Sequence, residues 1–433
     1  MNLFDLPRPF IYACLFLIGS CIGSFLNVCI HRFPGKIRLR DQLKSLNSHR
    51  SGCPRCAASI RWRDNIPILG WLMLLGRCRS CKKPISPRYI FVEALTAVLF
   101  VVVYWYEMPT TFWSGIDTSG LYDSRGPQQI RDFWDQATWL HTRYALHIFM
   151  ICGLIVATFI DFELKIIPDG STVPVMVAAF LAAIIVGQVH IVPLWFQDAS
   201  VVRVVRDVAS DWMTPFLFEW DAEPFAQKWP RLHAVLVSLA GFLVGGGVVW
   251  IVRIIGQWIL KQEAMGFGDV ILMAMVGSVI GWQPVLVVFF TAPMFAVFGA
   301  AVAWLTQRER RIPYGPWLSL ATLLLLLTWK QVWPVARTVF DMGPFLIWMG
   351  FFMVASLIVS LQMIQVVKRL LGIPLYPPDD EHEVPWSSAD HLSYYNSERP
   401  DEQVGQWQRP SWPGCRSGRG LGQSHQWRTG GRD

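Results

Sequence analysis

The chain alternates between long apolar runs and shorter polar segments. Most of the apolar runs approach the roughly 17 to 25 residues that cross a bilayer as a helix. The pattern therefore predicts an all-α, polytopic membrane protein with about eight to nine transmembrane helices. The predicted spans cover residues 10–30, 89–106, 144–160, 171–189, 233–251, 269–280, 284–304, 316–329 and 344–367.

Composition agrees with this pattern. Of the 433 residues, 53% are hydrophobic and only 16% are charged, whereas a soluble protein carries about 25% charged residues. The formal net charge is +7, and much of it lies in one loop, residues 31–88, where fourteen Lys and Arg accompany two acids, Asp41 and Asp64. Positively charged loops stay in the cytoplasm. We therefore expect this loop to be cytoplasmic, and its charge does not indicate nucleic-acid binding.

Alternation of the spans assigns a side to each remaining polar segment. Residues 107–143 and 190–232 are predicted to face outward, and the first of them carries five acids and three Arg. The third span ends at Asp161 on the cytoplasmic side, where a turn leads to Asp169. The sixth span starts on that same side with Asp269. The two acids Asp161 and Asp269 are therefore expected on one side of the bilayer, at a similar depth.

Asp269 belongs to the stretch Gly266-Phe267-Gly268-Asp269, which opens an apolar run. A carboxylate beside lipid is costly and by default indicates a functional site. Two carboxylates held close together share one proton, so one can activate water while the other donates a proton to the carbonyl oxygen or departing group. This favours a protease. The structural alternative makes Asp269 a helix N-cap and Asp161 an ordinary interfacial acid.

Four of the nine cysteines form two C-x-x-C pairs in the basic loop, Cys53 with Cys56 and Cys78 with Cys81. In a reducing compartment such pairs indicate a metal site rather than disulfides. Four thiolates complete a tetrahedral structural zinc site and leave no open position. Zinc is therefore expected to fold the loop rather than to catalyse, and a redox dithiol is the alternative.

Several features inside the spans are typical of helix packing. Small residues and an Asn end the first span, in Gly23-Ser24-Phe25-Leu26-Asn27-Val28, and the fifth span contains Gly245-Gly246-Gly247. Such residues let helices approach closely. For Arg88-Tyr89 and Glu93, at the start of the second span, a snorkelling anchor and an intramembrane pair are an open alternative.

The polar ends of the chain add little to the prediction of fold or function. Residues 1–9 are a short lead with no evident cleavable signal. The tail, residues 376–433, is rich in Pro, Ser, Gly, Arg and Trp and lacks helical or strand periodicity. We predict that it is disordered and cytoplasmic. Residues 89–369 would then form the polytopic catalytic membrane domain.

Taken together and in order, these motifs resemble the type IV prepilin peptidases, intramembrane aspartic proteases of the Gly-x-Gly-Asp type in bacterial inner membranes. The likeness covers residues 10–320 except for the two outward segments, which look longer than the family needs. The motifs that carry it are Gly23–Val28 with Arg32, the two C-x-x-C pairs around Asn65–Trp71, Arg88-Tyr89 with Glu93, Ile160-Asp161 with Ile167-Pro168-Asp169, Gly266–Val270, and Pro313-Tyr314-Gly315-Pro316.

The resemblance implies that Asp161 and Asp269 are the catalytic pair and that Asp169 is a nearby acid without a catalytic role. It implies cleavage of a short basic leader from type IV prepilins or pseudopilins, with pilus or type II secretion machinery as partners. It also implies N-methylation of the new N-terminus with S-adenosylmethionine, for which no binding residues are assigned. Unpaired acids on the same face, Glu93 for one, are expected to help hold the basic leader.

Two other classes of function use the same residues differently. In a transporter, intramembrane acids serve proton relays or ion sites, and no substrate gains a new N-terminus. In a zinc-dependent assembly scaffold, changes to the cysteines abolish partner binding while changes to the aspartates have no effect. The ordered set of motifs favours the protease.

Overall fold

The computed structural model describes residues 7–36, 38–47, 52–53, 56, 58–108, 136–187, 189–195, 198–211, 214–216, 223–260, 265–305 and 313–371. Within these ranges the regular structure is helical, apart from two isolated antiparallel bridges, and there is no longer strand. The predicted all-α class is confirmed for this part of the chain. The predicted disordered tail, and residues 109–135 of the first outward segment, lie outside the described residues.

Each predicted span corresponds to a helix. Among the described residues, seven helices are long and apolar enough to cross a membrane, whereas α6 and α10 have only 17 and 14 residues. Since a helix rises 1.5 Å per residue, α10 is only about 21 Å long. In chain order these helices are α1 (Arg8–Arg32), α4 (Arg88–Glu107), α5 (Gln136–Leu164), α6 (Asp169–Ile185), α9 (Pro230–Leu260), α10 (Phe267–Ile280), α11 (Trp282–Leu305), α12 (Gly315–Phe340) and α13 (Phe345–Leu370).

Several helices continue beyond the spans predicted for them, and α5 and α12 are two of them. We expected α5 to end at Ile160 and a turn to begin at Asp161, but the helix runs to Leu164, so Asp161 lies inside its last turn. We expected α12 to end at Trp329, but it continues to Phe340. Both predictions were wrong because a polar residue ends an apolar run without ending a helix. Lys330, for example, is a good helix former.

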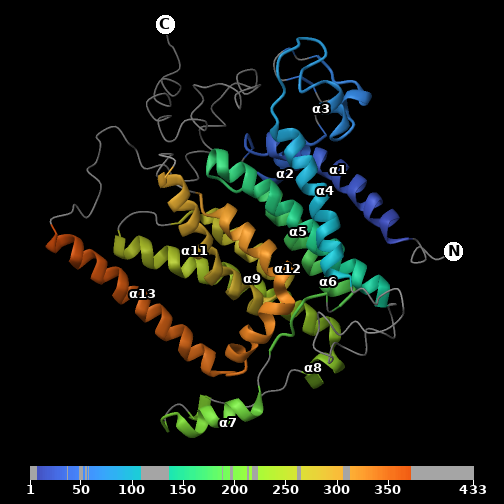
Figure 1. Cartoon of the computed structure of the whole chain (residues 1–433). Helices are drawn as coiled ribbons and strands as arrows, with labels where there is room; N and C mark the ends of the chain where they lie inside the picture. Colours follow the sequence, from blue (N-terminus) through green and yellow to red (C-terminus); the bar gives the residue numbers. More distant parts are fainter. Residues whose placement is uncertain are drawn as a thin grey trace.

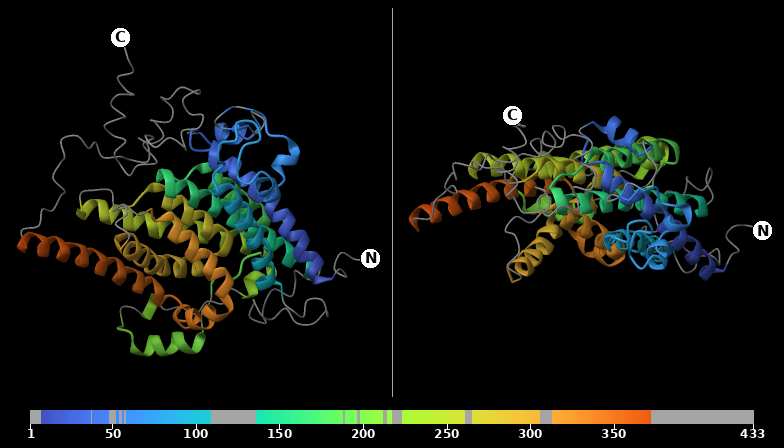
Figure 2. Two further views of the ribbon diagram at one scale, coloured as in Figure 1. Left: turned by 45° about the horizontal axis from the view of Figure 1, so that its top comes forward. Right: turned by 90° about the horizontal axis from the view of Figure 1, so that it is seen from above.

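The shorter helices form two groups at opposite ends of the apolar helices, as Figure 1 and the turned view in Figure 2 show. In the basic loop these are α2 (Leu39–Ser45), the 3-10 helix Trp62–Asn65 and α3 (Leu69–Met73). In the second outward segment they are α7 (Ala199–Val208), the 3-10 helix Thr214–Phe216 and α8 (Glu223–Lys228). The basic loop and the second outward segment thus lie at different ends of the molecule.

Helix α10 is at the centre of the bundle. It packs against α5, α6, α9, α11 and α12, and its residues from Asp269 to Ile280 are buried except Ile271. A helix that is apolar on all sides belongs in such an interior. In contrast, α13 has no buried residue, and Figure 1 shows it at the outside of the bundle.

Facing glycines bring α9 and α10 together. A Cβ atom on Gly241 would lie 1.9 Å from the carbonyl oxygen of Gly277, and a Cβ on Gly277 would lie 2.0 Å from that of Gly241. A Cβ on Gly245 would similarly overlap the carbonyl oxygen of Met273, whereas a Cβ on Gly247 would meet nothing within 4 Å. The predicted close approach of the fifth span therefore depends on Gly241 and Gly245, and not on Gly247.

Replacing Gly277 with Ala should destabilise the protein, because the added methyl group would overlap the carbonyl of Gly241. We expect a cost of about 1–3 kcal/mol, typical of overpacking, measured as a lower thermal unfolding temperature in detergent. Gly247→Ala is the matched control, since it adds the same methyl group where there is space. Equal unfolding temperatures for the two variants would contradict this view of the α9–α10 contact.

Candidate functional site

Asp161 projects from the last turn of α5 and is 6% exposed. Its Oδ2 atom accepts a hydrogen bond from the backbone N–H of Gly315, at 3.1 Å. Gly315 is the first residue of α12, distant in sequence. The carboxylate of Asp161 is thus buried and bonded to the start of a different helix.

Asp269 is the third residue of α10 and is 7% exposed. Gly266 is the N-cap of that helix, and its backbone hydrogen-bonds the Asp269 carboxylate. The structural alternative, in which Asp269 itself is the N-cap, is therefore wrong. The side chain instead reaches back to the cap residue, as an acid at the third helical position does in a capping box.

The structure brings the two acids into one neighbourhood. Asp161 and Asp269 are close enough for their charges to interact, and Asp269 also acts electrostatically on Tyr314, next to Gly315. The Ile167 side chain lies against two glycines, Gly268 and Gly315. A Cβ on Gly268 would be 3.0 Å from its Cβ, and a Cβ on Gly315 would be 3.2 Å from its Cδ1. Two buried carboxylates that are distant in sequence therefore lie in one neighbourhood, near the side chain of Ile167.

The other acids at this end have different environments. Asp169 is half-buried as the first residue of α6. Glu163 forms an ion pair with Arg88. The expectation that Glu93 is unpaired is wrong, because its Oε2 accepts the backbone N–H of Ile68 at 2.7 Å.

The glycine- and Asn-containing end of α1 packs on α4, as predicted. A Cβ on Gly23 would lie 2.7 Å from the Cα of Glu93, and a Cβ on Gly19 would lie 2.8 Å from the Cα of Ala97. The side-chain amide of Asn27 donates to the carbonyl of Tyr89 at 3.0 Å. These residues join the two helices that flank the basic loop, and hence they determine where the loop begins and ends.

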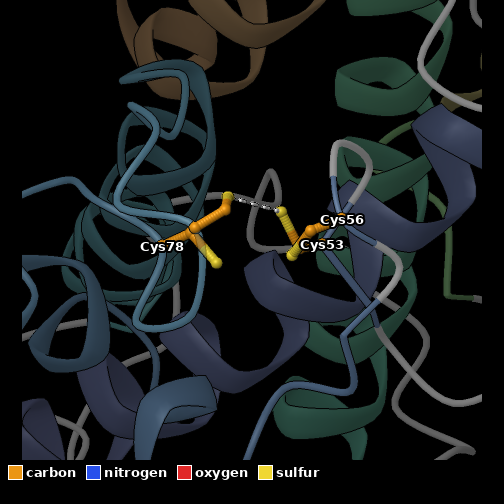
Figure 3. A group of neighbouring side chains, drawn as sticks. Cys53, Cys56 and Cys78 are labelled. Carbon is orange, nitrogen blue, oxygen red and sulfur yellow. Dashed lines mark hydrogen bonds between the residues drawn. The ribbon is translucent and has the colours of Figure 1, made fainter.

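The four predicted cysteines of the basic loop converge. Their sulfur atoms all lie within 4.8 Å of one another, and Cys53 Sγ is 3.9 Å from Cys81 Sγ. Figure 3 shows the Cys53, Cys56 and Cys78 side chains gathered between two loops. Zinc–sulfur bonds of about 2.3 Å in a tetrahedron place the sulfurs about 3.8 Å apart. The spacing therefore fits one metal ion held by four thiolates.

The two C-x-x-C pairs occupy matching turns. The N–H of Cys53 donates to the carbonyl of Ala58, and the N–H of Cys78 donates to that of Lys83, both at 2.9 Å. An isolated bridge closes each turn, Gly52 with Ser59 and Arg77 with Pro84. Each half of the site is thus held by its own backbone hydrogen bonds.

The thiols of this group differ in acidity. Hydrogen bonds from the backbone of Cys81 and Ser80 lower the pKa of Cys78 to about 7. A backbone hydrogen bond at Ala58 also lowers the pKa of Cys56, but desolvation and the three neighbouring thiols outweigh it and raise that pKa to about 11. Four thiols this close compete for ionisation, and a bound cation would relieve that competition.

The cysteine loop is attached to the membrane helices through a strained residue. Ile68 has a φ of 62°, which is uncommon for a β-branched residue. Its N–H donates to the buried carboxylate of Glu93 on α4. Within the loop, Arg79 forms two hydrogen bonds with Asp64, at 2.8 and 2.6 Å, and they lower the pKa of Asp64. The loop is thereby fixed to the end of the bundle that holds Asp161.

Sequence reasoning did not identify the roles of Gly315, Ile167 and Glu163. Gly315 was part of a recognised motif, Pro313-Tyr314-Gly315-Pro316, but the motif had no assigned role. A glycine beside a proline at the start of an apolar run was the available signal. Its contact with Asp161 could not be inferred, because it joins helices far apart in the chain.

Comparison with known proteins gives two matches to family models. The bacterial peptidase A24 N-terminal domain matches residues 17–107, from within α1 to the end of α4 and including the cysteine loop. The type IV leader peptidase family matches residues 210–303, which include Asp269. Asp161 lies between the two matched ranges.

Individual relatives align over most of their length. A prepilin leader peptidase/N-methyltransferase of Klebsiella pneumoniae is 30% identical over 283 residues, 65% of this chain and 90% of the relative. A type 4 prepilin-like proteins leader peptide-processing enzyme of Escherichia coli O78:H11 is 31% identical over 317 residues, 70% of this chain and 88% of the relative. No solved structure matches.

Replacing Glu93 with Ala should loosen the attachment of the cysteine loop, because the N–H of Ile68 would lose its acceptor. A hydrogen bond to a charged group contributes about 1.5–3 kcal/mol. We expect faster limited proteolysis within residues 58–86, measured by mass spectrometry of the fragments. Glu93→Gln keeps an acceptor oxygen and is the matched control. Equal cleavage rates for Glu93→Ala and the unsubstituted protein would show that this bond does not hold the loop.

Proposed function

This chain belongs to the type IV leader peptidase family, and on that premise we propose that it is an aspartic endopeptidase that cleaves the leader peptide of type IV prepilins or pseudopilins. The observation that supports the proposal is that Asp161 and Asp269 are buried in one neighbourhood. Both carboxylates are more than nine-tenths buried, and their charges interact. Burying an unpaired, ionised acid costs free energy. A proton shared by the two carboxylates and a common catalytic role would account for their buried position.

The pair would act as two carboxylates with one proton between them. The ionised member takes a proton from a water molecule as its oxygen attacks the scissile carbonyl carbon, and the protonated member donates its proton to the carbonyl oxygen. The resulting tetrahedral intermediate, a gem-diol, collapses when the C–N bond breaks: the departing nitrogen takes the proton that the first carboxylate gained from water, and one hydroxyl of the diol gives its proton to the other carboxylate. The pair then again holds one proton.

We place this site at the cytoplasmic face of the bacterial inner membrane. The chain is a multi-pass membrane protein, as its seven candidate helices and its relatives indicate. The basic loop adjoins the two acids, since Gln42 of α2 accepts the N–H of Gly170 at the start of α6, and positive loops remain cytoplasmic. We propose that the short helices α6 and α10 also cross the membrane, which gives nine spans.

We propose that the four cysteines hold one structural zinc ion. The sulfur spacing supports this choice, and a closed four-sulfur set leaves no coordination position for substrate or water. The ion would fold the loop, residues 52–86, at the end of the bundle where the acids lie. Because Glu93 and Glu163 already have partners, Asp169 is a better candidate than Glu93 to meet a basic leader.

N-methylation of the new N-terminus is the second proposed activity. The names of the relatives include N-methyltransferase, and S-adenosylmethionine would supply the methyl group. The described residues form no named strand, so they lack the glycine-rich strand-to-helix turn that commonly holds a nucleotide. We therefore assign no residue to the methyl donor. The pilus or type II secretion machinery that uses the processed pilin is the proposed partner.

Asp161→Asn and Asp269→Asn should each abolish cleavage of a co-expressed prepilin, because neither amide can carry the shared proton. Loss of a catalytic acid or base typically lowers rates by about 10²- to 10⁴-fold or more. Asp207→Asn, at an exposed acid of α7 at the other end of the molecule, is the control, and this variant should cleave the prepilin normally. Mass spectrometry of the pilin N-terminus reports the cut and any methyl group together. Retained cleavage by either dyad variant would contradict the proposal.

Purified protein should contain about one zinc ion per chain, as four-thiolate sites do. Cys53→Ser should lower this content and expose the loop to protease, while leaving Asp161 and Asp269 in place. Elemental analysis of freshly purified, reduced protein is the measurement, with Cys152→Ser, a buried cysteine outside the cluster, as the control. Absence of metal in the reduced protein would remove zinc from the proposal.

A further inference from the structure

The two acids occupy opposite kinds of helix end. Asp269 lies in the first turn of α10, where the partial positive charge of a helix N-terminus favours an anion. Asp161 lies in the last turn of α5, where the carbonyl end is partially negative and disfavours one. A carboxylate at that position therefore needs compensation from elsewhere in the fold. The charge of Lys165 supplies part of it.

The start of α12 is positioned to supply more. Its first residue, Gly315, donates its N–H to Asp161 Oδ2 at 3.1 Å. The next residue, Pro316, has no N–H. The N–H groups of Trp317 and Leu318 both donate to the carbonyl of Tyr314. The Gly315 amide is therefore the donor that this helix N-terminus directs at the carboxylate.

Only glycine allows this approach. A Cβ at position 315 would lie 2.6 Å from Asp161 Oδ2 and 3.2 Å from Ile167 Cδ1. Contacts below 3.0 Å force a displacement, and the nearest atom here is the carboxylate oxygen itself. A side chain at position 315 would thus move the Asp161 carboxylate away from the amide that binds it.

We propose that Gly315 is a positioning residue for the peptidase reaction, and that the first turn of α12 stabilises ionised Asp161 against the unfavourable end of its own helix. This inference rests on the proposed function. It makes the first turn of α12 part of the catalytic arrangement through its contact with Asp161. Tyr314 interacts electrostatically with Asp269, so the same turn is near both acids.

The test is Gly315→Ala in the full-length enzyme, assayed with purified prepilin in detergent. We expect kcat to fall by about 10- to 100-fold, as for a lost hydrogen bond to a charged group, while KM changes little. The control is Gly350→Ala, which adds the same methyl group on α13 where nothing lies within 4 Å. Its kcat should match that of the unsubstituted enzyme. A Gly315→Ala variant that keeps its full kcat would overturn the inference.

A second variant separates positioning from packing. Ile167→Val removes the Cδ1 atom that a new methyl group would approach but leaves the contact with Asp161. If Gly315→Ala unfolds at a lower temperature, the double variant should recover stability and still have a low kcat. Recovery of kcat by Ile167→Val would show that Gly315 acts through packing and would overturn the inference. Absence of cleavage by the unsubstituted enzyme would instead refute the proposed function itself.

Discussion

Burying two carboxylates beside lipid is the constraint on which the rest of the structure depends. An isolated ionised acid in such a place is strongly disfavoured. Each acid here has one backbone hydrogen bond, Asp269 with Gly266 and Asp161 with Gly315. The two charges interact. These bonds require three separate helix ends, those of α5, α10 and α12, to meet at one point, and the bundle is arranged so that they do.

The close packing of α10 follows from that requirement. The helix has only 14 residues, and the carbonyl-to-glycine contacts at Gly241 and Gly277 let α9 lie directly against it. On the other flank, glycines of α1 bring α4 close, and Glu93 then holds the cysteine loop by the strained Ile68. The cysteine loop is thus connected to the end of the bundle that holds Asp161 through a hydrogen bond to a buried acid.

Some of this could be predicted from sequence, for identifiable reasons. Helix class and the approximate place of each span follow from hydrophobic run lengths, and the convergence of Cys53, Cys56, Cys78 and Cys81 follows from their spacing. Helix ends could not be predicted in this way, because the continuation of α5 through Asp161 and of α12 beyond Trp329 depends on helix propensity and packing rather than polarity. The partners of Glu93 and Glu163 depend on tertiary contacts, as does the amide of Gly315.

The central claim is that Asp161 and Asp269 lie together at one end of the bundle. Thiol cross-linking in membranes tests it most directly, with both positions replaced by Cys and a short bifunctional reagent added. This account predicts a linked peptide joining positions 161 and 269, found by mass spectrometry. It predicts no link in the control pair with Cys at positions 161 and 341, since Asp341 ends α12 at the end of the molecule where α7 lies. A link in the control pair, or none between 161 and 269 in folded protein, would contradict it.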